Sequence, residues 1–131
     1  MRNSYPSMAE SQSNASPPEV VSTKTAEHYL WGDGCDGWFL LKGERFHVIQ
    51  EKMPPRTAEV MHYHRRARQL FYVLRGELTM RTEGEPVVIA AGQAVVMEPA
   101  MAHQAKNDSD KPVEFLTISC PPSHGDRFNC Q

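Results

Sequence analysis

The chain has 131 residues and a formal net charge of −2, which suits one folded domain and provides no basic surface of the kind that binds nucleic acid. No apolar run approaches the roughly 18 residues that span a bilayer, and the N-terminus lacks the apolar segment of a secretory signal. Cys35, Cys120 and Cys130 lack the spacing of a zinc knot or a disulfide framework, so we expect free thiols in a cytoplasmic protein with no nucleic-acid or membrane partner.

The first 25 residues are mostly Ser, Pro, Asn, Glu and Ala, with few bulky apolar side chains. Such a segment buries too little surface to offset the entropy of ordering, so residues 1–25 are predicted to form a flexible, disordered arm. Residues 26–131 would then form one compact β domain.

Past this arm, short β-type segments alternate with turns rich in Gly, Pro, Asn and Asp. The predicted strands are Glu27–Trp31, Gly37–Lys42, Phe46–Met53, Ala58–His64, Gln69–Leu74, Glu77–Thr82, Val87–Ala90, Ala94–Glu98, Ala102–Lys106 and Val113–Ser119. No window keeps an apolar period of 3.6 residues long enough to predict a helix. Many short, regularly spaced strands indicate an all-β sandwich or barrel.

Two histidines lie one residue apart in the predicted strand Ala58–His64. Because alternate residues of a strand share a face, His62 and His64 would point the same way and could ligate one ion. The same face carries the small apolar Val60, as expected for the inside of a barrel, whereas Glu59 would lie on the outer face.

Two further polar residues can join this pair. Gln69 follows His64 after four residues and shares its strand face with Phe71, so the side chain would return beside the two histidines. His103, from a later strand, would complete a set of three imidazoles, and the amide oxygen of Gln69 would add a neutral donor.

The order and spacing of these residues resemble the cupin superfamily, whose members are small double-stranded β-helix (jelly-roll) barrels. The family motifs have the forms G-x5-H-x-H-x3,4-E-x6-G and G-x5-P-x-G-x2-H-x3-N. The resemblance covers about residues 45 to 119, and the matching positions are His62, His64, Gly76, Gly92, His103 and Asn107. The chain departs from the pattern at Gln69, which stands in place of glutamate, and at Glu98 and Ala100, which replace the proline and glycine before His103.

The resemblance implies one divalent metal ion, Zn, Mn, Fe or Ni, held by His62, His64, His103 and, by substitution, Gln69. Gln69 would be either a direct ligand or a hydrogen-bond partner of one. A neutral amide binds a metal more weakly than a carboxylate does and leaves the site about one charge unit more positive. That charge favours an anionic ligand and weighs against oxidative chemistry.

Three more residues are candidates for contact with a small-molecule ligand: Gln50, Phe71 and Arg127. Gln50 would line the cavity, although the alternative register of its strand turns Glu51 and His47 inward instead. Arg127 lies in a tail that begins with two prolines and cannot continue a strand, so the tail is expected to fold either across the barrel or toward a second subunit. Across the barrel mouth, the charge of Arg127 could bind a carboxylate.

Three functions fit these observations. The first is a Lewis-acid isomerase or lyase acting on a small polar or anionic metabolite that resembles a sugar acid. The second is an Fe-dependent dioxygenase, and the third is a non-catalytic, metal-dependent binding or sensing module. A homodimer is expected from the family, with Tyr63 and Tyr72 available on an outer face for the contact.

Overall fold

The computed structural model describes residues 16–130, which form twelve β-strands and no helix. The strands are β1 (Glu27–Trp31), β2 (Cys35–Lys42), β3 (His47–Met53), β4 (Thr57–Ala58), β5 (His62–Tyr63), β6 (Arg68–Arg75), β7 (Glu77–Arg81), β8 (Val87–Ala90), β9 (Ala94–Met97), β10 (Gln104–Asn107), β11 (Val113–Cys120) and β12 (Phe128–Asn129). The predicted all-β jelly-roll class is confirmed.

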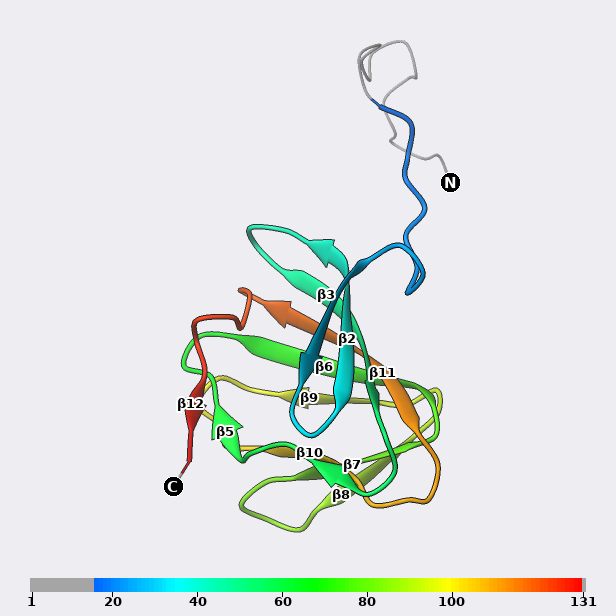
Figure 1. The fold of residues 1–131 in the computed structure, drawn as a ribbon. Coiled ribbons are helices and arrows are strands. Elements are labelled where there is room, and N and C mark those ends of the chain that lie inside the picture. Colours follow the sequence, from blue (N-terminus) through cyan, green and yellow to red (C-terminus); the bar gives the residue numbers. More distant parts are fainter. Residues whose placement is uncertain (1–15, 131) are drawn as a thin grey trace, which may run out of the picture.

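The strands pair entirely in antiparallel fashion into three sheets. The largest sheet has the order β1-β2-β3-β11-β6-β9, the second has the order β4-β10-β7-β8, and β5 pairs with β12 in a short third sheet. The second sheet lies across from the first and closes the barrel, and β5 and β12 run side by side at one edge (Figure 1).

The core lies between the inner faces of the two larger sheets. Along β3 and β11, every second residue is buried, as the two-residue period of a strand requires. The largest fully buried apolar side chains are those of Phe115, Met53, Leu78, Met80 and Val73. Gly76 allows the tight β6–β7 turn, because its φ is +83° and a Cβ there would lie 2.6 Å from the carbonyl oxygen of Pro112.

The predicted strand Ala58–His64 is wrong in one respect: it is two short strands, β4 and β5, with an irregular break between them. At the break the chain buries Glu59 and leaves Val60 54% exposed, the reverse of the predicted alternation. The cause is a long-range contact, because the Glu59 carboxylate accepts a hydrogen bond from the buried backbone amide of Ala105 at 2.9 Å. The prediction also missed β12 entirely.

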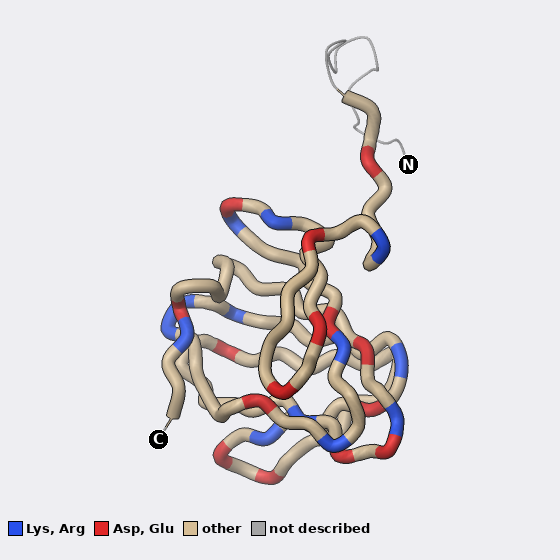
Figure 2. The backbone as a smooth tube through the Cα atoms, viewed as in Figure 1, with Lys and Arg blue, Asp and Glu red and all other residues tan. Residues whose placement is uncertain are grey.

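Residues 1–15 of the predicted arm lie outside the described residues, and residues 16–25 extend away from the barrel without joining a strand (Figure 1). The division at residue 25 therefore stays a prediction. Acidic and basic residues are interspersed over the described backbone (Figure 2). Within residues 16–130, no helix is long and apolar enough to cross a membrane.

The homodimer, the cytoplasmic location and the lack of nucleic-acid partners also stay predictions. One of the aromatic residues expected in the dimer contact is engaged within the chain, because the Tyr63 ring stacks on that of Phe128 in β12, with 5.4 Å between centroids. Tyr72 remains 38% exposed.

Candidate metal centre

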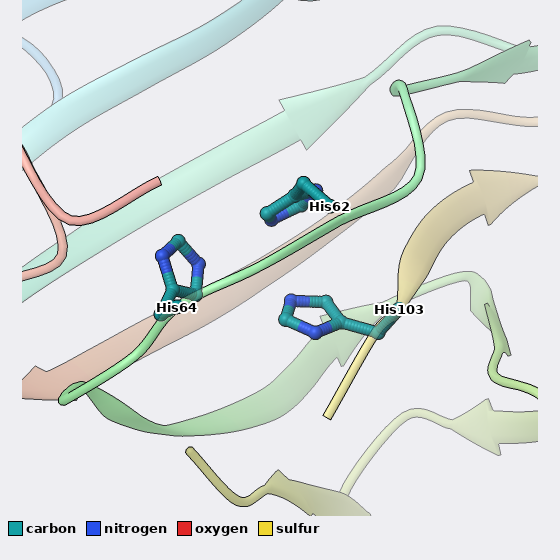
Figure 3. Close-up of side chains that lie close together, drawn as sticks. All are labelled: His62, His64 and His103. Atoms are coloured by element: carbon teal, nitrogen blue, oxygen red, sulfur yellow. The ribbon is translucent and has the colours of Figure 1, made fainter. Parts of the chain in front are cut away.

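Three buried histidines converge at one end of the barrel interior. His62 is the first residue of β5, His64 directly follows that strand, and His103 directly precedes β10. An isolated bridge joins His62 and His103 through two backbone hydrogen bonds of 3.0 and 2.8 Å, which places the two histidines side by side. One ligating nitrogen from each ring lies within 4.8 Å of the other two, and the three rings gather around a common space (Figure 3).

Backbone carbonyl groups fix the protonation of these rings. The Nδ1 atoms of His62, His64 and His103 lie 2.8, 2.6 and 2.9 Å from the carbonyl oxygens of Val60, Asp126 and Met101, respectively. A carbonyl oxygen only accepts, so each Nδ1 carries the ring proton and each Nε2 keeps its lone pair. The Nε2 atoms of His64 and His103 are buried without a hydrogen-bond partner within the described part of the chain. Each of these buried lone pairs is therefore available to ligate an ion.

Electrostatics keep the rings neutral. Burial lowers the pKa of His62 to about 3 and that of His103 to about 4, and it also lowers the pKa of His64. Repulsion from Arg127 acts on all three rings in the same direction. Neutral imidazole is the form that ligates a metal ion, so the electrostatics favour metal binding near neutral pH.

Gln69 supplies a fourth donor beside the histidines. Its Nε2 donates a 2.9 Å hydrogen bond to the Ser119 hydroxyl, and its Oε1 is buried without a partner in residues 16–130. An orphaned amide oxygen and three neutral nitrogens match the ligand chemistry of Zn²⁺, Mn²⁺, Fe²⁺ or Ni²⁺. These residues therefore fit a divalent ion, and its identity is not fixed by the donor set.

Sequence reasoning missed a residue that holds this site in place, Asp126. Its carboxylate accepts hydrogen bonds from the backbone amides of Arg65, Arg66 and Ala67 at 3.0, 2.9 and 3.0 Å. Burial acts to raise the pKa of Asp126, but the three amides outweigh it and the pKa lies below its ordinary value. Because the Asp126 carbonyl also holds His64, the C-terminal segment is fastened to the candidate site.

Two of the three histidines, His62 and His64, line a cavity of about 300 Å³, together with Gln69. Apolar wall comes from Trp31, Ile49, Phe71 and Phe115, and polar groups come from Glu51, Glu59, Thr117, His124 and Arg127. Phe71 and Arg127 thus lie where the sequence predicted ligand contacts. The predicted position of Gln50 is wrong, because β3 follows the alternative register and turns His47, Ile49 and Glu51 inward.

Two buried carboxyl groups share this cavity. Burial raises the pKa of Glu51 to about 8 and that of Glu59 to about 7. Glu59 faces Arg127 at 3.5 Å, and the same carboxylate oxygen lies 3.8 Å from Nδ1 of His62. No local signal in the sequence could find Glu59, because a regular strand would turn this side chain outward.

Comparison with known proteins agrees with this architecture. A family model described as "Cupin domain" matches residues 49–119. An oxalate-binding protein of Thermotoga maritima is 28% identical over 67 residues, which cover 51% of this chain and 55% of that protein. The whole activity of that relative therefore does not transfer to this chain by similarity.

Two solved structures share the fold. A protein of Klebsiella pneumoniae with a double-stranded β-helix domain gives a TM-score of 0.71 at 18% identity, covering 88% of this chain and 99% of its own. A sugar phosphate isomerase of Silicibacter pomeroyi from the same superfamily gives 0.69 at 19% identity, covering 78% of this chain and 75% of its own. At these identities the likeness concerns the fold alone.

Proposed function

This chain belongs to the cupin domain family, and we propose that it is a metal-dependent member that acts on a small anionic metabolite, of the size and polarity of a sugar acid, by isomerase- or lyase-type chemistry. One observation carries the proposal. Three neutral imidazoles face one another beside a cavity that also contains an arginine, and two of them have buried Nε2 atoms without a hydrogen-bond partner among residues 16–130. The oxalate-binding relative supports an anionic ligand.

The ligand set in this proposal is His62, His64 and His103 with Gln69. An ion bound there supplies Lewis-acid polarisation of a ligand oxygen. All four donors are neutral, so none of the ion's charge is cancelled by its own ligands, and the cavity attracts anions.

The chain's own residues bind and orient the ligand. Arg127 is 41% exposed at the side chain and contacts Glu59, Asn129 and the Val60 carbonyl. These contacts do not use all five guanidinium N–H donors, so donors remain for a carboxylate at the cavity mouth. Phe71 and Phe115 form an apolar wall that excludes water from the reacting part of the ligand and strengthens the electrostatic contacts there.

The test begins with metal content. Protein purified without added metal is examined by elemental analysis as wild type and as His62→Ala, with His28→Ala, a histidine half exposed at the side chain, as the matched control. We expect about one ion per wild-type chain, the same in His28→Ala, and loss of most metal in His62→Ala. Unchanged metal content in His62→Ala would refute the ligand set.

Oxalate then serves as the anionic probe. Oxalate should raise the melting temperature of the metal-loaded wild type, and the gain should shrink in Arg127→Ala at unchanged metal content. Equal stabilisation of the metal-loaded and metal-free proteins would contradict the proposal.

The second candidate is a metal-dependent module that binds an anion without turnover, and similarity to the oxalate-binding protein of Thermotoga maritima favours it. The two candidates separate on product formation. Conversion of a sugar acid under anaerobic conditions, with Zn²⁺, Mn²⁺ or Ni²⁺ in place, indicates the enzyme, whereas anion-dependent stabilisation without any product indicates the module.

A further inference from the structure

Two hydroxyl side chains on β11 hold polar side chains of the neighbouring strands. Ser119 accepts a hydrogen bond from Gln69 of β6, and the Thr117 hydroxyl donates one to Oε1 of Glu51 on β3. Because Ser119 and Thr117 are two residues apart, they share the inner face of the sheet. The strand between β3 and β6 thus fixes one polar group on each side, and both groups line the cavity.

Glu51 differs from the other acidic residue of the cavity in what surrounds it. Glu59 has Arg127 as a cation and the Ala105 amide as a donor. Within residues 16–130, Glu51 makes no ion pair, and its only hydrogen-bond partner is Thr117, through one carboxyl oxygen. The second oxygen is left to the cavity, and Glu51 as a residue is only 9% exposed. An ionised carboxylate in such a place would lack both water and a counter-charge.

We propose that Glu51 is a carboxylic acid at neutral pH whose proton forms a hydrogen bond to an oxygen of the bound anion, and that it thereby determines the anion specificity of the cavity. This inference rests on the proposed function, since it names a ligand contact in the same cavity. A hydrogen bond from a neutral acid to an anionic oxygen is short and strong, whereas an ionised Glu51 would repel the anion.

The groups around Glu51 support its neutral state. Burial, followed by the nearby Glu59, raises the pKa of Glu51, while the Thr117 hydrogen bond and the charge of Arg127 act against this rise. On β1 and β2, burial raises the pKa values of Tyr29 and Cys35, so neither adds a charge at neutral pH. Among the described residues, the charged neighbours are thus Glu59 and Arg127, which pair with each other. The proposed divalent ion would act in the same direction as Arg127, against the rise in pKa, so the metal-free protein is where the neutral state of Glu51 is tested first.

The test measures oxalate affinity against pH by calorimetry, for the metal-loaded wild type, Glu51→Gln and the control Glu85→Gln, an exposed glutamate. If binding needs the Glu51 proton, wild type and control lose about tenfold in affinity per pH unit above the pKa of that group. The amide introduced by Glu51→Gln is a neutral donor at every pH, so this variant should lack the loss. The proposal is overturned if all three proteins lose oxalate affinity with pH at the same rate. Competition of hydroxide with oxalate for the ion would give that result.

Infrared spectroscopy of the metal-free protein tests the protonated state without any ligand. A carbonyl-stretch band of neutral carboxyl groups should be present in wild type at neutral pH and shift in D₂O. Because the pKa of Glu59 is also raised, Glu51→Gln should remove the Glu51 component and leave that of Glu59, whereas Glu85→Gln should keep both. Absence of that band in wild type overturns the inference and leaves the proposed function standing. If the band is present but oxalate does not bind at any pH, the proposed function is overturned, and so is the contact between Glu51 and the ligand.

Discussion

Replacement of Asp126 by alanine is the sharpest perturbation that the structure offers away from the metal ligands. The carboxylate is 4% exposed and gathers three backbone amides from the connection between β5 and β6. That connection separates His64 from Gln69, so its conformation sets how these two side chains approach each other. Asp126→Ala removes the carboxylate and leaves the main chain intact.

The cost follows from where the three amides lie. The Ala67 amide is in a residue only 1% exposed, and a buried donor without a partner costs about 1–3 kcal/mol. Arg65 and Arg66 are exposed, so water can replace the carboxylate at their amides. The loss of each of these two hydrogen bonds costs about 0.5 kcal/mol of unfolding free energy. The sum is about 2–4 kcal/mol of unfolding free energy, which for a domain of this size lowers the melting temperature by about 10 °C or more.

The variant is measured by thermal unfolding and by metal titration against a chelating dye. We expect metal affinity to fall by about 10- to 100-fold, because the carbonyl that orients His64 is released. Asp126→Asn keeps one acceptor oxygen and should fall between wild type and Asp126→Ala, while the exposed Asp110→Ala serves as the matched control. Wild-type melting temperature and metal affinity in Asp126→Ala would show that this carboxylate does not support the site.

Three further predictions concern the barrel and the arm. The pKa of Glu51 in the folded protein is raised to about 8, so folding favours the protonated carboxyl group over the ionised one. The contribution of Glu51 to the free energy of unfolding is therefore fully present at low pH and is lost as pH rises to about 8. Denaturant titrations should therefore show that Glu51→Gln gains stability relative to wild type by about 1.4 kcal/mol per pH unit between the unfolded and folded pKa values, and a constant difference would contradict this. Gly76→Ala should destabilise the fold by about 2 kcal/mol more than Gly92→Ala, because both have positive φ but only Gly76 meets the carbonyl of Pro112; equal melting temperatures would refute the steric argument. Deletion of residues 1–21 should shift the melting temperature by less than about 2 °C, and a large drop would show that the arm packs on the barrel or on a partner.

Local chemistry was sufficient to predict most of the barrel. Strands such as Glu27–Trp31 and Val87–Ala90 were predicted with their observed bounds because Gly, Pro and charged turns flank them. The break between β4 and β5 and the existence of β12 could not be predicted, since the first depends on an amide in β10 and the second on pairing with a strand about 65 residues earlier.

The histidines and the remainder of the cavity differ in how far the sequence could locate them. Alternation placed His62 and His64 on one face, and the resemblance to the cupin motifs added His103, so the convergence of the three histidines was predictable. The orientation of β3 could not be predicted, because each face of this strand mixes apolar with polar residues. Periodicity alone therefore supports both registers equally. The pairing of Glu51 with Thr117 resolves that choice, and it is a contact between strands.

The charge balance of the cavity explains why glutamine is a sensible residue at position 69. A carboxylate there would add a third acidic group to a cavity that already buries Glu51 and Glu59 and contains one arginine. Each added negative charge would raise the pKa values of the other carboxyl groups and weaken the attraction of an anion. In the proposed function, a neutral amide held by Ser119 would leave both a bound divalent ion and Arg127 to attract the ligand. If the proposed function is correct, glutamine at position 69 would weaken the hold on the ion and strengthen the attraction of an anion.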